Sequence, residues 1–383
     1  MFFYVDEGGN TGLNLFDSVQ PALYYGVISS SANLDVVAKS AVEQMRSMLG
    51  VERIHAKELG NDKLSLIAKH VAEVQRKFCL GFDFYTVVKA DHAVMCFFDQ
   101  VFDSGMNDAV RWSNYWTPLR FRLLLNLAML FDEELAKKAW DARIEGNDGI
   151  ANRLLIEVCQ ELISRLPEVE DEGARCIHDA LLWAIKNPDS IGYNVSTSNL
   201  PKKEKKGPAQ QISPNIIGFQ FVMKGIASRL ETAKREASRI VVDQQGEFNG
   251  AQQTLAEFFK AASGVQFISG PEMPTINFDS MPSIPIEFLP GHASVGLELV
   301  DVMLWVHRRL AENKPVAHVL LPLVSANLGK GITDEISMQG IWERWKVRLS
   351  APVDLSHLSP EQLANAQALA DAETARIRAA VDD

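Results

Sequence analysis

The sequence predicts an α/β protein in which a mixed sheet is interrupted by a large helical insertion and followed by a helical tail. Short apolar, β-branched runs lie near the start of the 383-residue chain and return after residue 238. The stretch between them has helical periodicity and almost no strand signal. We therefore expect a discontinuous core of residues 1–90 and 238–350, a helical insertion at 91–237 and a helical tail at 351–383.

The first part of the core is expected to supply three strands. Phe2 to Val5 form an apolar, aromatic and β-branched run that ends at two acids, as a buried strand would. Residues 22–28 form a second run, and a hairpin is the simplest way to pair it with the first. Alternating apolar residues predict a third strand over 78–90.

Two helices are expected between the second and third strands. Asn33 can cap a helix that carries Val36 and Val37 among its apolar positions, and Gly50 ends it. The second helix is expected to be capped by Asn61 or Asp62.

The insertion is predicted to be helical over residues 119–143, 150–166, 173–187 and 218–238. A loop at 194–214 separates two of these helices and contains four lysines within five residues: Lys202, Lys203, Lys205 and Lys206. These lysines are candidates for contact with a nucleic-acid backbone. A solvated loop is the simpler interpretation of the same residues.

Strand character returns at residues 239–243, where an apolar run again ends in an aspartate, Asp243. Asn249 is expected to cap the helix that follows. Residues 265–269 and 284–289 predict two more strands, and an apolar helix begins at residue 295. In the tail, Ser359 and Pro360 suit the start of an alanine-rich helix, which buries little area per turn and is expected to be peripheral.

Composition restricts the class of protein. The chain is 47% hydrophobic and 23% charged, as in a soluble globular protein. Its net charge of −11 argues against a protein that coats polyanions without specificity. The four cysteines have no metal-site spacing and are expected to be reduced, mostly buried thiols. No signal peptide or membrane span is predicted, so we expect a cytoplasmic protein without a membrane partner. The small side chains of the tail permit a homodimer contact.

Acidic residues follow strands or interrupt helices at four places. Asp6 and Glu7 end the first strand before a glycine-rich turn that contains Asn10, and Asp243 ends a later strand. These residues suit a hard cation, although aspartate and asparagine are also ordinary turn formers.

The other two places lie on expected helical turns. His55 and Glu58 are three residues apart, as are Glu298 and Asp301, so each pair shares a helical face. A surface turn would explain the first pair. An acid within an apolar helix needs a partner, for which a structural link to an arginine or a loop amide would be enough.

Four segments together resemble a bacterial protein family, the unknown-function family thirty-eight hundred, which is similar to ribonuclease H-like proteins. They are Tyr4-Val5-Asp6-Glu7-Gly8-Gly9-Asn10, His55-Ala56-Lys57-Glu58-Leu59, Val241-Val242-Asp243 and Gly296-Leu297-Glu298-Leu299-Val300-Asp301. The resemblance covers about residues 1–90 and 238–310. Gly8, Glu298 and Val300 depart from the family's usual Ser, Gln and Ala, and Glu298 adds a charge where the family has an amide.

The resemblance implies a ribonuclease H-like mixed sheet and a metal-dependent nuclease. Asp6, Glu58, Asp243 and Asp301 would then be the catalytic acids, binding two Mg²⁺ or Mn²⁺ ions that hydrolyse a phosphodiester of RNA, DNA or a hybrid. His55 would assist catalysis by orienting a ligand or protonating the leaving group.

Three further residues are expected around the metals: Glu7, Asn10 and Glu298. An inactive nucleic-acid-binding or regulatory protein, and a metal-dependent phosphohydrolase of a nucleotide or small phosphoester, are the alternatives. The company the family keeps suggests defence against phage.

Overall fold

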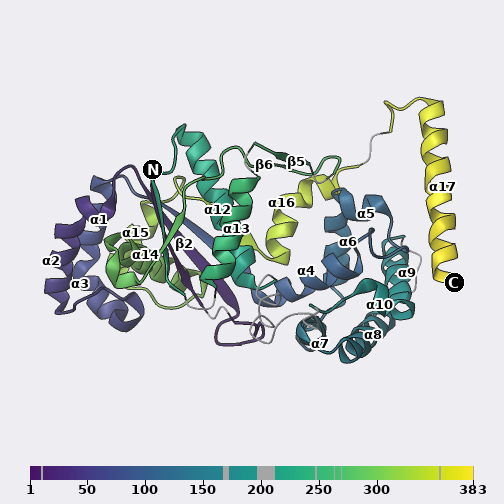
Figure 1. Ribbon diagram of the computed structural model, residues 1–383, viewed down its shortest axis with the longest axis horizontal. Helices are drawn as coiled ribbons and strands as arrows, with labels where there is room; N and C mark the ends of the chain where they lie inside the picture. The colour runs from purple at the N-terminus through teal and green to yellow at the C-terminus, as the bar shows by residue number, and fades with distance from the viewer. Residues whose placement is uncertain are drawn as a thin grey trace.

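The computed structural model describes residues 1–9, 12–166, 172–195, 212–245, 248–262, 264–268, 270–352 and 355–382. Its centre is a six-stranded mixed sheet, which confirms the predicted α/β class (Figure 1). The strand order is β7-β4-β1-β2-β3-β8, and the bounds are β1 Phe2–Gly8, β2 Ala22–Ser30, β3 Gly81–Val88, β4 Arg239–Asp243, β7 Ile286–Leu289 and β8 Thr333–Ile336.

The first three strands form an antiparallel unit, and the others extend it on both sides. β1 pairs with β2 as the predicted hairpin, and β2 pairs antiparallel with β3. β4 runs parallel to β1, β7 runs parallel to β4, and β8 runs parallel to β3. Every residue of β2 is buried, as expected for a strand covered on both faces.

One face of the sheet is covered by helices from both parts of the core (Figure 1). They are α1 Leu34–Val37, α2 Lys39–Leu49, α3 Ala56–Lys77, α14 Val295–Ala311 and α15 Leu321–Ser325. Gly296 lets α14 lie close on β1, since a Cβ at this position would come within 2.1 Å of the Tyr4 ring. The opposite face is covered by α12 Pro214–Ala233 and α13 Asn249–Ala261.

The insertion is helical and builds its own apolar core beside the sheet (Figure 1). Its helices are α4 Lys89–Val101, α5 Trp112–Trp116, α6 Leu119–Ala128, α7 Glu133–Ile144, α8 Asp148–Ser164, α9 Glu172–Lys186 and α10 Pro188–Ile191. Two later helices, α16 Met338–Ser350 and α17 Pro360–Asp382, add Ile341 and Ile377 to that core. The predicted tail helix therefore exists. Its second half docks on the insertion, while its first half is exposed.

Several helix predictions need correction. The segment 119–143 is two helices, because Asp132 caps a new helix through a hydrogen bond from the Leu135 N–H. Asn33 does cap a helix, but Val36 and Val37 are 70% and 42% exposed, so they do not serve its core.

The caps predicted at Asn61 or Asp62 and at Asn249 are wrong. α3 already begins after His55 and is kinked at Gly60, and Asn61 instead bonds the backbone of Pro315 and Ala317. Phe248 precedes α13, whereas Asn249 lies inside this helix and accepts the Gln245 N–H.

Two strands also differ from expectation. β5, Gln266–Ile268, pairs with β6, Thr275–Asn277, in a separate two-stranded sheet rather than in the central one. β8 was not predicted, because Thr333-Asp334-Glu335-Ile336 has no apolar pattern and its pairing with β3 decides its conformation.

The four cysteines are free thiols, but the prediction that most are buried is wrong: Cys159 is buried, Cys96 and Cys176 are half-buried, and Cys79 is exposed. No helix within the described residues combines the length and the apolar character that crossing a membrane requires.

Candidate functional site

Two of the predicted acids lie side by side at the ends of neighbouring parallel strands. Val5 of β1 is in register with Val242 of β4, so the next residues, Asp6 and Asp243, occupy adjoining positions. Side chains alternate between the faces of a strand, and Tyr4 packs in the core on the α14 side. Asp6 and Asp243 therefore face the same side as Tyr4, at one end of the sheet.

Asp301 reaches this end of the sheet from α14, which packs across β1. Its Oδ2 accepts a hydrogen bond from the Ala56 N–H at 2.7 Å and lies 3.1 Å from Nδ1 of His55. The partner that an acid in an apolar helix requires is thus the start of α3. The structure joins two of the four sequence segments at this point, although 245 residues separate Ala56 from Asp301.

Glu298 lies one turn before Asp301 and performs a different task. Its side chain is 1% exposed, Oε2 accepts the Ile54 N–H at 2.7 Å, and Arg46 forms an ion pair with it. Glu298 thus holds the segment that leads to His55 against α14. The charge of Glu298 is matched by Arg46, and Glu298 does not join the aspartates.

Glu58 lies apart from the three aspartates, at the rim. Its side chain is 68% exposed, and its Oε1 is 3.5 Å from Arg53 and 3.8 Å from Nε2 of His55. Arg53 also acts electrostatically on Asp243. Sequence reasoning missed Arg53, because a lone arginine before an apolar residue looks like any surface residue.

The three aspartates repel one another in a partly buried place. Burial, and then the carboxylates of Asp301 and Asp243, hold the pKa of Asp6 well above its ordinary value. Burial raises the pKa of Asp243, and Asp301 adds to the rise. The hydrogen bond to Asp301 is the main reason that the pKa of His55 is raised. A positive charge placed near these carboxylates would therefore reduce their repulsion and stabilise the site.

Glu7 points to the opposite face of the sheet, toward α12. Nδ2 of Asn215 donates to both of its carboxylate oxygens, at 3.0 and 3.2 Å, and Nε2 of Gln252 donates to Oδ1 of Asn215 at 3.1 Å. Burial raises the pKa of Glu7 to about 8. This polar network supports the strand end from behind. Asn215 had no sequence signal beyond its place at the start of a helix.

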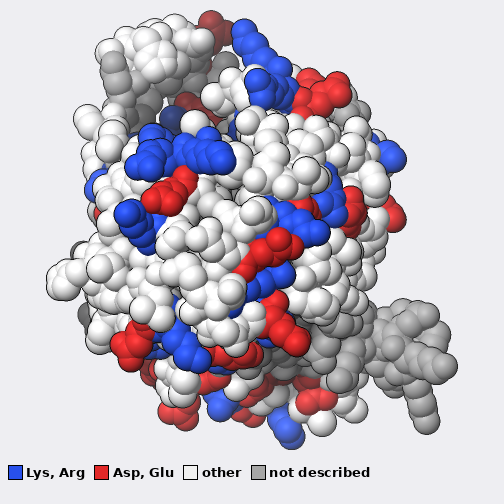
Figure 2. Space-filling view, turned by 90° about the vertical axis from the view of Figure 1, so that its left-hand side faces the viewer, with Lys and Arg blue, Asp and Glu red and all other residues white. Residues whose placement is uncertain are grey.

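The remaining predicted contacts, Asn10 and the lysines Lys202, Lys203, Lys205 and Lys206, lie outside the described residues. On the end of the molecule where α2 and α3 lie, lysines and arginines are mixed with aspartates and glutamates and form no field of one sign (Figure 2). Attraction for a phosphate must therefore come from local groups rather than from this face as a whole.

The aspartates fit a divalent cation that is shared with a substrate. No three His, Cys, Asp or Glu side chains in the described part of the chain are placed to hold an ion by themselves. Mg²⁺ commonly uses one or two carboxylates, several waters and the phosphate oxygens of a substrate. The raised pKa values of Asp6 and Asp243 match that mode of binding, whereas a closed protein cage would not leave room for the phosphate.

A cleft of about 430 Å³ begins at Asp301 and extends along the second half of α14. Its lining combines carboxylates and His55 with cationic side chains and an indole. The lining residues are Glu7, Gly8, Gly9, Gln20, His55, Lys57, Asp301, Leu304, Trp305, Arg308, Arg309, Glu312 and Lys314. The cleft thus joins hard oxygen ligands to groups that can hold phosphate.

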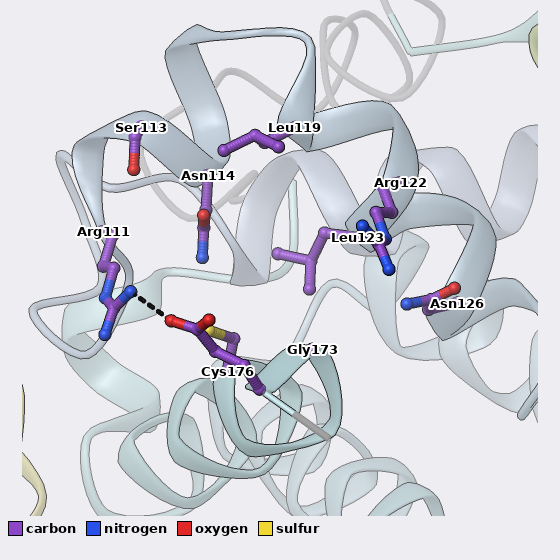
Figure 3. A pocket seen from close by; sticks show the side chains of 10 residues that line it. Arg111, Ser113, Asn114, Leu119, Arg122, Leu123, Asn126, Gly173 and Cys176 are labelled. Atoms are coloured by element: carbon purple, nitrogen blue, oxygen red, sulfur yellow. Dashed lines mark hydrogen bonds and ion pairs between the residues drawn. The ribbon is translucent and has the colours of Figure 1, made fainter. Parts of the chain in front are cut away.

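A second cavity, of about 240 Å³, lies among α5, α6 and α9 in the insertion (Figure 3). Arg111 and Glu172 form an ion pair on one side of it, at 2.7 Å, while Arg122 and Asn126 lie on the other. Glu172 is the one carboxylate among its described lining residues. This cavity lacks the grouped acids of the first, so we place the candidate active site at the sheet.

The fold and this site define an α/β protein with aspartates at two strand ends, beside a cleft lined by both acidic and cationic side chains. Comparisons of the chain with protein-family models, with curated proteins and with solved structures find no match. The functional conclusion therefore depends on the geometry and chemistry of the site.

Proposed function

We propose that this protein is a nuclease that hydrolyses phosphodiester bonds with the help of Mg²⁺ or Mn²⁺. The observation that carries the proposal is the proximity of Asp6, Asp243 and Asp301, which come from two parallel strand ends and one helix. Asp301 also lines a cleft that contains cationic side chains. Carboxylates that repel one another are costly to gather, and a bound cation removes that cost.

Each residue has a distinct task in this proposal. Asp6, Asp243 and Asp301 would hold the cation, which lowers the pKa of a bound water and stabilises charge on a phosphate oxygen. His55 is held by Asp301, and its raised pKa favours the protonated ring, which can give a proton to the leaving oxygen. Glu58 is exposed at the rim, where its carboxylate remains accessible.

We also propose that the sheet is ribonuclease H-like. Three antiparallel strands follow one another in the chain, β4 then joins parallel to β1, and acids stand at the ends of β1 and β4. The closing helix α14 supplies the next acid. These features support the resemblance of the four sequence segments.

A substrate panel tests the proposed function. The full-length protein would be incubated with labelled RNA, DNA and RNA–DNA hybrid, each with Mg²⁺, Mn²⁺ or EDTA, and also with a nucleotide and a small phosphodiester. We expect cleavage of nucleic acid that EDTA stops. Divalent-dependent hydrolysis of the small phosphoesters alone would identify a phosphohydrolase. Binding of nucleic acid without cleavage under any of these conditions would identify an inactive binding protein.

A further inference from the structure

The side of α14 that lines the cleft carries an acid, an aromatic ring and a cation on successive helical turns. Asp301, Trp305 and Arg309 are four residues apart and all line the cleft. At the rise of an α-helix, Trp305 lies about 6 Å and Arg309 about 12 Å along the axis from Asp301. The cleft thus presents an acid, an aromatic ring and a guanidinium that lies over this ring.

Two cations in the cleft, Arg309 and Lys57, have no acidic partner among the described residues. Arg308 and Lys314 both pair with Glu312, at 2.8 and 2.7 Å, so their charge is already matched. The Nε–H of Arg309 donates a hydrogen bond to the carbonyl of Pro315 at 2.8 Å. The Arg309 guanidinium lies over the Trp305 ring, 4.9 Å from its centre. Lys57, at the start of α3, is the other unmatched cation of the cleft.

The same proline carbonyl connects the two walls of the cleft. Nδ2 of Asn61 on α3 donates to Pro315 at 3.0 Å, and Arg309 donates to the same oxygen. Lys57 lies four residues before Asn61, on the other side of the kink at Gly60. Lys57 and Arg309 thus both line the cleft, and the Pro315 carbonyl links the two helices that carry them.

We propose that this part of the cleft binds an unpaired nucleotide of a single strand, with the base against Trp305 and a phosphate between Arg309 and Lys57. An aromatic face binds any base that is free of its partner, whereas the bases of a duplex are already stacked on one another. Unmatched cations in turn favour a phosphate. The inference rests on the proposed function and names its substrate as single-stranded.

Binding can be measured without cleavage. A short fluorescent oligothymidine strand would be titrated with the full-length protein in Ca²⁺ in place of Mg²⁺, with a gel to show that the strand stays intact. A duplex containing the same strand, and thymidine monophosphate as a competitor, complete the set. We expect the single strand to bind at least about tenfold more tightly than the duplex, and the mononucleotide to compete weakly, because stacking contributes about 1–3 kcal/mol per base.

Variants locate the effect. Trp305→Leu should weaken strand binding about tenfold or more, Trp305→Phe should retain most of it, and Arg309→Gln should reduce the slope of log affinity against log salt by about 0.7. Trp342→Leu is the matched control, since Trp342 is a 42% exposed tryptophan on α16, outside the cleft. The retained binding of Trp305→Phe separates loss of the ring from loss of the fold.

Three results would overturn this inference: equal binding of strand and duplex, equal effects of Trp305→Leu and Trp342→Leu, or no strand binding at all. A mononucleotide that competes as well as the strand would also reject it, in favour of a free-nucleotide site. Because hydrolysis is not measured here, strand binding without divalent-dependent cleavage would refute the proposed nuclease and leave this inference standing.

Discussion

At the scale of single residues, two acids on one turn of α14, Glu298 and Asp301, have different roles. Glu298 is paired with Arg46 and the Ile54 N–H, so its charge is used in holding the chain. Asp301 receives the Ala56 N–H and His55 on one oxygen only, so its other oxygen has neither of these partners. Two similar side chains three residues apart thus have a structural role and a proposed catalytic role.

The first prediction concerns Asp243→Asn. This change removes one carboxylate from the cluster with Asp6 and Asp301, so we expect divalent-dependent cleavage to be lost while the midpoint of thermal unfolding without metal stays the same or rises slightly. Asp279→Asn, in an exposed loop, is the control and should change neither quantity. If Asp243→Asn unfolded the protein along with the loss of cleavage, Asp243 would be structural.

At the scale of elements, the contact of α14 with β1 sets the position of Asp301. Gly26 on β2 belongs to the same contact, since a Cβ there would lie 3.0 Å from both Leu304 and the Phe82 ring. Glycines in the strand and in the helix thus allow the two elements to approach closely. An acid on α14 can meet acids on the strands only because the backbones are this near.

The second prediction tests that approach. Gly296→Ala places a methyl group in the Tyr4 ring, so we expect it to lower the free energy of unfolding by about 1–3 kcal/mol and to reduce cleavage as α14 moves away. Gly250→Ala in α13 is the matched control, because nothing lies within 4 Å of a Cβ there, and it should stabilise by about 0.5–1 kcal/mol. Urea unfolding of both variants gives the comparison, and equal effects would show that the tight contact does not matter.

The third prediction concerns the docking of α17. Ile377 is 7% exposed in the core of the insertion, and Lys186 and Arg376 add polar contacts between α17 and the insertion. Ile377→Ala should destabilise by about 1–3 kcal/mol, whereas Leu369→Ala, at a position 71% exposed, should stay within about 0.5 kcal/mol.

Neither α17 variant should alter divalent-dependent cleavage, because this helix docks on the insertion and not on the sheet. Thermal unfolding and the cleavage assay measure the two effects. A loss of cleavage in Ile377→Ala without unfolding would make the tail part of the active assembly.

At the scale of the whole molecule, core and insertion are joined where the chain passes between them. His92, near the start of α4, lies 2.7 Å from the carbonyl of Ile212, which precedes α12. Nε1 of Trp140 on α7 donates to the carbonyl of Leu13, in the loop after β1, at 2.7 Å. The insertion is thus tied to the core both at its own ends and at the loop beside the acids.

The fourth prediction is a pH dependence at this junction. Burial lowers the pKa of His92, so the unfolded chain takes up a proton before the folded one does. Stability from the neutral ring is complete above about pH 6.5 and falls by up to about 1.4 kcal/mol per pH unit as the pH drops below that value.

The free-energy difference between the wild type and His92→Gln isolates this effect, because buried acids such as Glu7 titrate with the opposite sign. We expect that difference to shrink between about pH 6.5 and pH 5 in urea unfolding, since the variant lacks the titrating ring. A difference that stays constant over this range would show that the ring is not kept neutral by burial.

The sequence by itself determined the local features of this protein. β-branched and aromatic runs placed β1, β2, β3, β4 and β7, helical periodicity placed most of the helices, and Asn33 was recognised as a cap. Asp6 and Asp243 could be identified as candidate site residues from the sequence, because a carboxylate that follows an apolar strand is visible in the order of residues alone. These features depend on neighbours along the chain, which is the information a single sequence contains.

Only the tertiary structure decided which distant groups meet. The register of β1 with β4 put Asp6 beside Asp243, and the packing of α14 brought Asp301 to Ala56 and His55. The same packing placed Glu298 against Arg46 and the Ile54 N–H, where it has a structural role. Such contacts depend on close packing between segments that are hundreds of residues apart, and no local propensity encodes that distance.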